Sequence, residues 1–425
     1  MFNRKTNSNL GINILGHISG EYGLGEAVRS NIRAMESAGI SFVLKDMKVD
    51  WHRNLDKTYT NFSEDNPYPI NFIHLNPEEV KEVDPEYLQG KYNIGFWAWE
   101  TPIFPPDRQW AFEPFDEIWT PSNYSGDGIA MASPVPVIRI PHSMSLPQPS
   151  LTREDLDLPE DRFIFLFMFD LHGGFERKNP LATIKAFRKA FGKDNEDVLL
   201  ILKFSNSKYH SERLEQIKSF VGDDSSIFFL DLHLMRDEID ALIYNSDCYV
   251  SLHRSEGFGL TIAESMYYGK PVIATAYSSN IEFMNVGNSY LVPYNLIELE
   301  EDTGVFQKGN NWADPDVDYA ANLMQEVVSN PQEAKQVGNR AAKEIKSLLS
   351  PVTLGERIRS RLEQIMKMKT NPTLTNPSDI SFTEIGTQSY QSLAWMKTAE
   401  KIYGELKQSQ LKLNGTQSTL ECSQR

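Results

Sequence analysis

Residues 253–264, HRSEGFGLTIAE, place two glutamates eight positions apart around a pair of glycines. The preceding run, DCYVSL at residues 247–252, is short, apolar and partly β-branched, which is typical of a buried strand. The following TIAESMYY has apolar residues at helical spacing and ends at Gly269. The stretch therefore predicts a strand, a glycine-rich turn and a helix, with Glu256 in the turn and Glu264 about five residues into the helix.

Strand-like and helix-like segments alternate on both sides of this turn. In residues 1–145 the expected strands are INILG, SFVLK, INFIHL, NIGFWAW, EIWT and VPVIRI, with helices near residues 25–38 and 77–88. In residues 161–350 the expected strands are RFIFLFMF, DVLLILKF, SIFFLD, DCYVSL and PVIATA, again separated by helical segments. Such alternation is typical of parallel sheets covered by helices. We therefore expect two doubly wound, Rossmann-like α/β domains facing a cleft, because such sheets bind ligands beyond the carboxyl ends of their strands.

Proline-rich and polar segments separate these parts. Residues 141–160 hold four prolines and no long apolar periodicity, so we place an interdomain linker at residues 146–160. A helix at residues 351–368 begins at a proline and is expected to return towards the N-terminal domain. Residues 369–425 predict a polar linker and an amphipathic helical tail. The apolar stripe of that tail suits docking on this protein, self-association with a second copy, or peripheral contact with a membrane surface, and the sequence leaves all three open.

Composition narrows the class of protein. The 425 residues are 40% hydrophobic, enough for two cores, and the 42 basic and 58 acidic residues give a net charge of −16. Because no basic block stands out, nucleic acid is not expected as a partner. Only Cys248 and Cys422 are present, so no disulfide framework is expected and a cytoplasmic location fits. No apolar run is long enough for a membrane-spanning helix. The apolar stripe of the tail adds the inner face of the membrane as an alternative location.

The turn at residues 253–264 has a definite chemical character. Gly257 and Gly259 let the backbone approach a ligand closely, and the free N–H groups at the start of the helix favour an anion. Carboxylates such as Glu256 and Glu264 accept hydrogen bonds from hydroxyl groups. A ligand with hydroxyls on both sides of a diphosphate, such as a nucleotide sugar, meets both demands. The alternative is a solvated turn in which Glu256 is exposed and Glu264 lies on a surface helix.

The longer segment SLHRSEGFGLTIAESMYYGKPVIAT, residues 251–275, resembles the donor-site signature of retaining glycosyltransferases of family 4. The resemblance extends over about residues 10–366. It implies the GT-B architecture, with an N-terminal acceptor-binding domain at residues 1–145 and a C-terminal nucleotide-sugar-binding domain at residues 161–350. It also implies a hexosyltransferase that needs no metal or other cofactor and that serves polysaccharide or glycoconjugate biosynthesis. Its partners would be a nucleotide sugar donor and a glycan or glycoconjugate acceptor.

The same resemblance assigns roles to individual residues. It implies that Glu256 positions the transferred sugar, that Lys178 and Arg177 in FERKNPLATIKAF neutralise the diphosphate, and that Glu264 binds the ribose. We also expect Lys178 to start a helix, where a cation is unfavourable unless an anion is bound nearby. The further donor-binding residues that the resemblance implies are Gly257, Phe258, Gly259, Leu260 and Thr261 in the central turn, and Gly23, Leu24 and Gly25 in the glycine-rich first turn. The alternatives are a solvated charge pair for Arg177 and an ordinary strand-to-helix connection for the first turn.

Several candidates carry less specific signals. Many relatives have an arginine six positions before the lysine, where this chain has His172, whose neutral ring offers one donor in place of a guanidinium fork. For Asn280 the two expected alternatives are a contact with the sugar and a helix cap. For His142 they are a position facing the cleft and a hydrogen bond to the backbone. Trp99 and Glu100 in GFWAWETPIFP are candidates for the acceptor side of the cleft, with core packing as the alternative for the tryptophan.

Other chemistries are less well supported by the sequence. The acidic run DPDVD at residues 314–318 is typical of a solvated turn, and no metal ligands are assigned. A hydrolase triad motif and a phosphate loop are absent from the sequence. Two alternatives to glycosyl transfer stay open. One is a GT-B phosphorylase or sugar-nucleotide epimerase, and the other is a non-catalytic scaffold that binds nucleotide sugar and partner glycosyltransferases.

Overall fold

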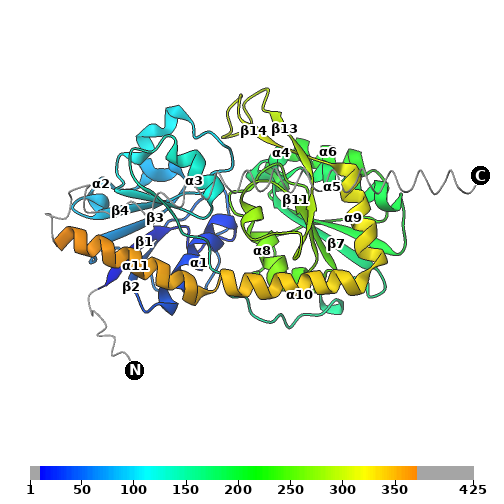
Figure 1. The fold of residues 1–425 in the computed structure, drawn as a ribbon, viewed down its shortest axis with the longest axis horizontal. Helices are drawn as coiled ribbons and strands as arrows, with labels where there is room; N and C mark the ends of the chain where they lie inside the picture. Colours follow the sequence, from blue (N-terminus) through cyan, green and yellow to red (C-terminus); the bar gives the residue numbers. More distant parts are fainter. Residues whose placement is uncertain (1–9, 371–425) are drawn as a thin grey trace, which may run out of the picture. The chain divides into compact units, whose positions relative to one another are not determined.

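The computed structural model describes residues 10–370, so the expected tail lies almost wholly outside the described residues. The chain divides into two compact units, residues 1–363 and residues 364–425. Both Rossmann-like sheets belong to the first unit (Figure 1). Of the second unit, only residues 364–370 are described, and they form the end of a helix.

The first sheet lies in the N-terminal part of the chain and is parallel throughout, with the order β2-β1-β3-β4-β5-β6. Its strands are β1 (Gly11–Gly16), β2 (Ser41–Asp46), β3 (Ile70–His74), β4 (Tyr92–Phe96), β5 (Glu117–Thr120) and β6 (Val137–Arg139). The helices among them are α1 (Gly23–Ser37), α2 (Pro85–Leu88) and α3 (Asn123–Ala130). The four central strands, β1, β3, β4 and β5, are buried on both faces, as in other parallel sheets covered by helices, whereas the edge strands β2 and β6 are only partly buried.

Hydrogen bonds between asparagine side chains connect the first sheet near the amino ends of its strands. Asn13 on β1 donates to the Asn71 side chain on β3, and Asn71 donates to Asn93 on β4, each over 2.9 Å. All three asparagines are buried. A shift of register would leave these amides unpaired inside the protein, so the polar ladder stabilises the observed alignment.

The second sheet has the order β12-β11-β10-β7-β8-β9 and is also parallel. Its strands are β7 (Phe163–Asp170), β8 (Val198–Ser205), β9 (Ile227–Asp231), β10 (Cys248–Ser251), β11 (Val272–Thr275) and β12 (Tyr290–Val292). The helices that follow these strands are α4 (Phe175–Lys178), α5 (Pro180–Phe191), α6 (Ser211–Val221), α7 (Arg236–Asn245) and α8 (Leu260–Tyr267). Proline begins α5 and Gly192, at φ 77°, ends it, as is common at helix ends.

A short antiparallel hairpin and three helices complete the described chain. The hairpin pairs β13 (Tyr294–Glu298) with β14 (Asn311–Pro315). The helices are α9 (Val317–Ser329), α10 (Pro331–Leu348) and α11 (Pro351–Thr370). Within residues 351–363, Arg361 on α11 forms an ion pair with Glu117 on β5. A side chain at Gly355 would come within 2.1 Å of the Ala34 carbonyl on α1, so this glycine allows the two helices to approach closely.

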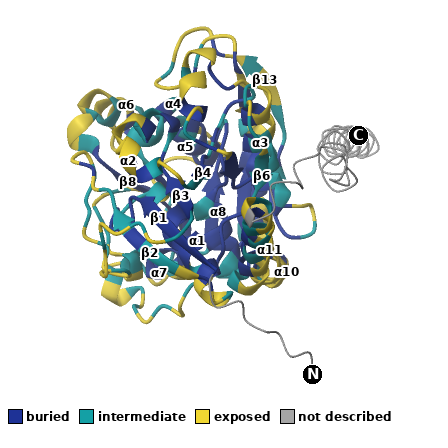
Figure 2. Cartoon of the chain, turned by 90° about the vertical axis from the view of Figure 1, so that its left-hand side faces the viewer, coloured by how far each residue is buried: buried dark blue, intermediate teal, exposed yellow. Residues whose placement is uncertain are grey.

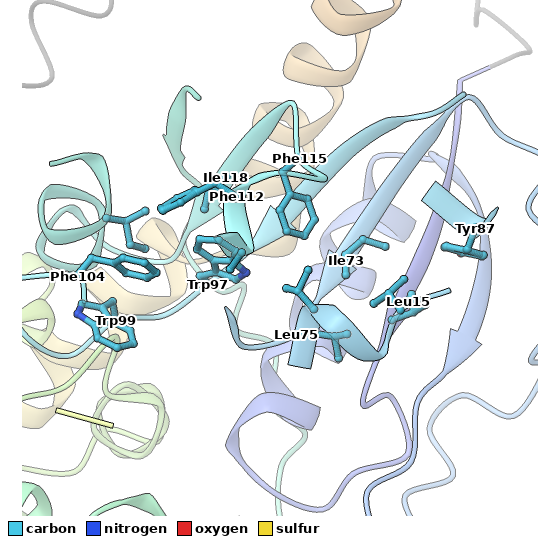
Figure 3. Packing of buried hydrophobic residues seen from close by; sticks show 14 residues of the cluster. Leu15, Ile73, Leu75, Tyr87, Trp97, Trp99, Phe104, Phe112, Phe115 and Ile118 are labelled. Atoms are coloured by element: carbon cyan, nitrogen blue, oxygen red, sulfur yellow. The ribbon is translucent and has the colours of Figure 1, made fainter. Parts of the chain in front are cut away.

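Buried residues are concentrated in the strands and exposed residues in the loops (Figure 2). One aromatic cluster lies beside the first sheet and includes Trp97, Trp99, Phe104 and Phe112 (Figure 3). The Trp97 and Phe104 rings stack 5.8 Å apart, and Trp97 is fully buried. The segment after β4 is therefore anchored in the core before it reaches the site.

Two expected elements differ from those observed. The expected helix at residues 77–88 is a 3₁₀ segment, Pro77–Glu82, followed by the single turn α2. Val83 separates them in an extended conformation because Asp84 caps a new helix at Pro85, with its side chain accepting from the Glu86 N–H. The expected strand NIGFWAW ends at Phe96, so Trp97 and Trp99 belong to the loop that follows it.

No helix in residues 10–370 combines the length and apolar character needed to cross a membrane.

Candidate active site

A cavity of about 1180 Å³ lies beyond the carboxyl ends of strands from both sheets. Segments that follow β1 and β4 line it from the first sheet, and segments that follow β7, β9 and β10 line it from the second. This is where doubly wound sheets bind ligands, since their turns and helix N-termini gather there. The volume exceeds the range of about 300–1000 Å³ that is usual for small-molecule sites, so it has room for more than one substrate.

The turn between β10 and α8 forms one wall of the cavity and contacts the start of α3, which follows a strand of the first sheet. Ser122 and Ser125, before and within α3, donate hydrogen bonds to the Gly257 carbonyl over 2.8 and 3.2 Å. A Cβ at Gly257 would lie 3.1 Å from Cβ of Ala98, which is a tight contact. Gly259 has φ 88° and is the N-cap of α8, a conformation that glycine adopts without strain. The turn therefore directs the N-terminus of α8 towards the cavity.

Glu256 and Lys178 form an ion pair in this cavity. Lys178 Nζ donates to Glu256 Oε1, and Arg177 Nη1 lies 3.4 Å from Glu256 Oε2. Burial alone would raise the pKa of Glu256, but the two cations outweigh it and lower the pKa to about 2. Burial also lowers the pKa of Lys178, with Glu256 opposing that change. The carboxylate is therefore ionised throughout the physiological range, and it lies beside the ammonium.

The structure corrects the expected position of Lys178. It is the last residue of the short helix α4, two positions before α5 begins, and not the first residue of a helix. Its counter-anion in the described residues is Glu256, brought from a different strand end. The premise of a cation destabilised at a helix N-terminus was therefore wrong, although the residue does line the cavity.

Arg177 is held mainly by backbone carbonyls. Its guanidinium donates to Ser255 O over 2.9 Å and to Gly173 O over 2.7 Å, and it lies 6.0 Å from the Phe306 ring centre. It is 5% exposed. These contacts leave Lys178 as the more accessible of the two cations, with Arg177 adding positive charge from behind the turn that carries Glu256.

A second cluster of charged side chains surrounds Glu264. Arg236, the first residue of α7, donates to Glu264 Oε1 over 2.7 Å and also pairs with Asp240. Burial raises the pKa of Glu264 to about 7, with Arg236 opposing this and the Glu26 carboxylate on α1 adding to it. Glu26 itself pairs with Arg33, and the cations around it hold its pKa at about 2 despite its burial. All of these side chains line the cavity.

His172 lies in a group of rings at the cavity wall. Its Nδ1 is 2.8 Å from Nε2 of His210, its ring stacks on Tyr209, and the edges of Trp51 and His52 approach it. Its other nitrogen, Nε2, is buried and has no hydrogen-bond partner among residues 10–370. The imidazole is thus oriented by aromatic neighbours, as a single potential donor or acceptor for a ligand.

His142 and Glu100 line the cavity, and burial shifts the pKa of both side chains. Burial lowers the pKa of His142 to about 3, so its ring is neutral at pH 7. The edge of Phe258 packs against this ring at 4.9 Å. Burial raises the pKa of Glu100, while Arg177 opposes that shift from 3.9 Å. Trp99 also lines the cavity, but its Nε1 is satisfied by Ile103 O and its ring packs on Phe104.

Most of the site residues predicted from the sequence line this one cavity. Gly23 and Leu24 line it with Gly257, Phe258, Gly259, Leu260 and Thr261. Gly25 does not, and its lack of a side chain has a structural reason, because a Cβ there would come 2.0 Å from Gly20 O. Asn280 is also outside the lining. Its amide is used internally, donating to Thr275 O and lying 3.1 Å from His253 Nε2, and Asn280 does not cap a helix.

Several cavity residues were missed by sequence reasoning. Arg236 and Lys203 line the cavity beside Glu26 and Arg33. A cation at the first position of α7 is unfavourable for the helix dipole, which was an available signal for Arg236. A single lysine inside the apolar strand VLLILKFS was a comparable signal for Lys203. Within the described part of the chain, His, Cys, Asp and Glu side chains form no group of three suited to hold a metal ion.

Comparison with known proteins identifies the class of the chain. Residues 150–344 match the family model described as glycosyl transferases group 1, whereas no curated protein matches the sequence. HepE of Anabaena, solved with UDP and glucose, gives a TM-score of 0.60 at 14% identity over 84% of this chain and 100% of that chain. Sucrose-phosphate synthase of Thermosynechococcus elongatus gives 0.59 at 16% identity over 84% and 100%. A glycosyltransferase of Rickettsia africae gives 0.58 at 14% identity over 85% and 99%.

These likenesses agree with the expectations for fold and class. The similarity to whole chains with two such domains confirms the GT-B architecture. The family match covers the second sheet and both glutamates of the central turn, and it identifies the chain as a glycosyltransferase.

Proposed function

We propose that this glycosyltransferase is a retaining, metal-independent enzyme of family 4. It would transfer a hexose or deoxyhexose from a nucleotide diphosphate sugar to a hydroxyl group of a growing glycan. The observation that carries the proposal is the ion pair between Lys178 and Glu256 beside the N-terminus of α8, in a cavity lined from both sheets. HepE, which shares the fold, has been solved with UDP-glucose, which supports a nucleotide sugar as the donor.

In this proposal, the leaving diphosphate lies against Lys178 and the first N–H groups of α8. An ammonium has three donors, so Lys178 can keep Glu256 while it binds a phosphate oxygen. The N–H groups of Gly259 and Leu260 at the helix start add fixed positive charge towards the same anion. Arg177, held against the backbone of the turn that carries Glu256, adds further positive charge. Together these groups stabilise the negative charge that develops on the diphosphate as the glycosidic bond breaks.

The two glutamates would hold the hydroxyl-bearing ends of the donor. Glu256, kept ionised by its cations, positions the transferred sugar, and Glu264 accepts hydrogen bonds from the ribose. The acceptor would enter from the side of Trp99, Glu100 and His142. The incoming hydroxyl attacks on the face from which the diphosphate leaves and passes its proton to the departing phosphate oxygen, so the anomeric configuration is kept.

The test is transfer by the full-length protein from a panel of nucleotide sugars to oligosaccharide acceptors, with and without EDTA. Proton NMR of the transfer product reports the anomeric configuration of the new glycosidic bond. Retention and unchanged rates in EDTA are expected. Inversion contradicts the retaining assignment, and loss of activity in EDTA that added metal restores contradicts metal independence.

The two alternatives have distinct outcomes in the same assays. A strict need for inorganic phosphate identifies a phosphorylase, and turnover of the donor without an acceptor into an epimer identifies an epimerase. Tight donor binding without transfer or hydrolysis identifies a scaffold. Light scattering of the full chain and of a chain ending at residue 388, with flotation on anionic vesicles, tests the roles predicted for the tail. Cell fractionation tests the cytoplasmic or membrane-face location that belongs to this proposal.

A further inference from the structure

Lys203 is a buried cation that the proposed mechanism does not use. It is the sixth residue of β8, is 8% exposed, and lines the cavity. No hydrogen bond or ion pair joins its ammonium to any of residues 10–370. Burial lowers its pKa, and Asp170 and Asp231 only partly oppose this from a greater distance. The residue is largely buried and its ammonium, which is accessible from the cavity, has no protein partner in that range, so the position suits a ligand that supplies an acceptor.

Both charged and apolar side chains lie around Lys203, the charged ones being Asp170, Asp231 and His233. Met168 on β7 is its partner in the parallel register, and both residues line the cavity. Leu234, Met235 and Ile239, just before and within α7, line the cavity too. A slot in which an ammonium group lies beside an apolar side chain such as Met168 suits a flat ring that carries an acceptor at its edge.

The strand order places this slot at one end of the donor site. Glu256 follows β10, Lys178 follows β7, and Lys203 lies on β8, which is the next strand in the order β10-β7-β8-β9. Neighbouring strands are about 4.8 Å apart, so the slot lies about 10 Å from the turn after β10. A donor with its sugar at Glu256 and its diphosphate at Lys178 then extends its nucleoside towards β8. Glu264 on α8 and Arg236 on α7, which pair with each other, line the same cavity.

We propose that Lys203 recognises the nucleobase of the donor and selects bases with an oxo group at C4 of a pyrimidine or C6 of a purine. The inference rests on the proposed function, because it takes a nucleotide sugar as the donor. Lysine can only donate hydrogen bonds. Uracil, thymine and guanine present a carbonyl oxygen at this position, whereas cytosine and adenine present an amino group. Two donors facing each other would leave both unpaired in a buried slot, so the amino bases are rejected.

The experiment is titration calorimetry of the full-length protein with two matched pairs of nucleotides, UDP against CDP and IDP against ADP. Each pair differs by oxo or amino at the position in question and in the protonation of the neighbouring ring nitrogen. The wild-type protein is expected to bind the oxo member of the preferred pair at least ten-fold more tightly. Lys203→Met, which keeps the length and removes the charge, is expected to reduce this preference to less than about three-fold, mainly by weakening the oxo nucleotide. Lys203→Arg, which keeps a donor, is expected to retain part of it.

Other outcomes overturn the inference. Equal binding of the oxo and amino members by the wild-type protein does so. Equal weakening of all four nucleotides by Lys203→Met would place the ammonium at the diphosphate instead. If the wild-type protein binds neither nucleoside diphosphates nor any nucleotide sugar, the proposed function itself fails, which is a different result from binding without base preference.

Thermal unfolding without nucleotide provides a second measurement. Because Lys203→Met removes an unpaired buried charge, its midpoint is expected to equal or exceed that of the wild-type protein. A clear fall in the midpoint would mean that the ammonium stabilises the protein by itself, and it would contradict a role in ligand recognition. Lys203→Gln, a neutral variant that keeps a donor, supplies a second folded variant for the calorimetry.

Discussion

Arg236 Nη1 lies 2.7 Å from Oε1 of Glu264, and this contact joins the first turn of α7 to the middle of α8. The two residues are 28 positions apart in the sequence. The pair combines opposite effects on the glutamate, because burial disfavours its charge and the guanidinium favours it. The resulting pKa of about 7 makes Glu264 a group whose charge changes near neutral pH.

The affinity for the donor should depend on pH through Glu264. Only the ionised carboxylate makes a charge-assisted bond to the ribose, so binding of a nucleotide sugar is expected to strengthen by up to about ten-fold from pH 6 to pH 8. Glu264→Gln should show no such dependence, and Glu264→Ala should weaken binding by about 1.5–3 kcal/mol at pH 8. Calorimetry at several pH values measures this. Equal pH profiles for the wild-type protein and Glu264→Gln would exclude Glu264 as the titrating group.

Stability without the donor should change with pH in the opposite direction. The pKa of Glu264 is higher in the folded protein than the value of about 4.3 in an unfolded chain, so the folded state binds the proton more tightly. This contribution to stability is therefore complete below about pH 4 and is lost as the pH rises through 7. Relative to the wild-type protein, Glu264→Gln should gain free energy of unfolding between pH 5 and pH 8 in urea titrations. A constant difference across that range would argue against the raised pKa.

Arg236 should act as a positioning residue. Arg236→Gln removes the neighbouring positive charge, so the pKa of Glu264 should rise further above 7 and the midpoint of the binding profile should move to higher pH. Arg236→Lys keeps the charge and should keep the midpoint close to that of the wild-type protein. Loss of the ion pair with Asp240 lowers stability in Arg236→Gln as well, but a loss of stability alone would not move the midpoint. An unchanged midpoint in Arg236→Gln would contradict the coupling.

The ion pair between Lys178 and Glu256 should appear as a coupling energy. Their side chains are 18% and 10% exposed, so each charge depends on the other more than a surface pair does. In a double-mutant cycle with Lys178→Met and Glu256→Gln, urea unfolding at pH 7 should give an interaction energy of about 1–3 kcal/mol. Lys185→Met, on the exposed side of α5, serves as the control partner and should give none. Additive effects of the two site substitutions would contradict the pairing.

The two glycines at the start of α1 should respond differently to alanine. A Cβ at Gly25 would meet the Gly20 carbonyl at 2.0 Å, whereas a Cβ at Gly23 would have no atom within 4 Å. Gly25→Ala should therefore destabilise the protein by about 1–3 kcal/mol, and Gly23→Ala should change its stability by less than about 0.5 kcal/mol. Thermal and urea unfolding measure both. If Gly23→Ala leaves stability intact but weakens donor binding, Gly23 belongs to the binding site, and unchanged binding would show that no close backbone approach is needed there.

The sequence by itself determined the elements and the central turn. Apolar runs at strand spacing, separated by helical segments, were sufficient to predict two parallel sheets, because these patterns depend on neighbours within a few positions. The glycines around Glu256 identified a turn between a buried strand and a helix for the same local reason. Local chemistry also explains why the single helix expected at residues 77–88 is two separate segments, because Asp84 and Pro85 start a new helix there. The apolar spacing alone did not reveal this break.

Only the tertiary structure decided which charges meet. Lys178 pairs with a glutamate 78 positions away, Arg236 pairs with Glu264, and Lys203 is left without a partner in residues 10–370. These outcomes depend on the strand order β10-β7-β8-β9, in which neighbours in space are not neighbours in the chain. The same holds for Gly25 and Asn280, whose residue types suggested ligand contacts but whose neighbours are internal backbone and side chains. A sequence pattern specifies local conformation, whereas electrostatic partners and cavity walls are specified by the packing of distant segments.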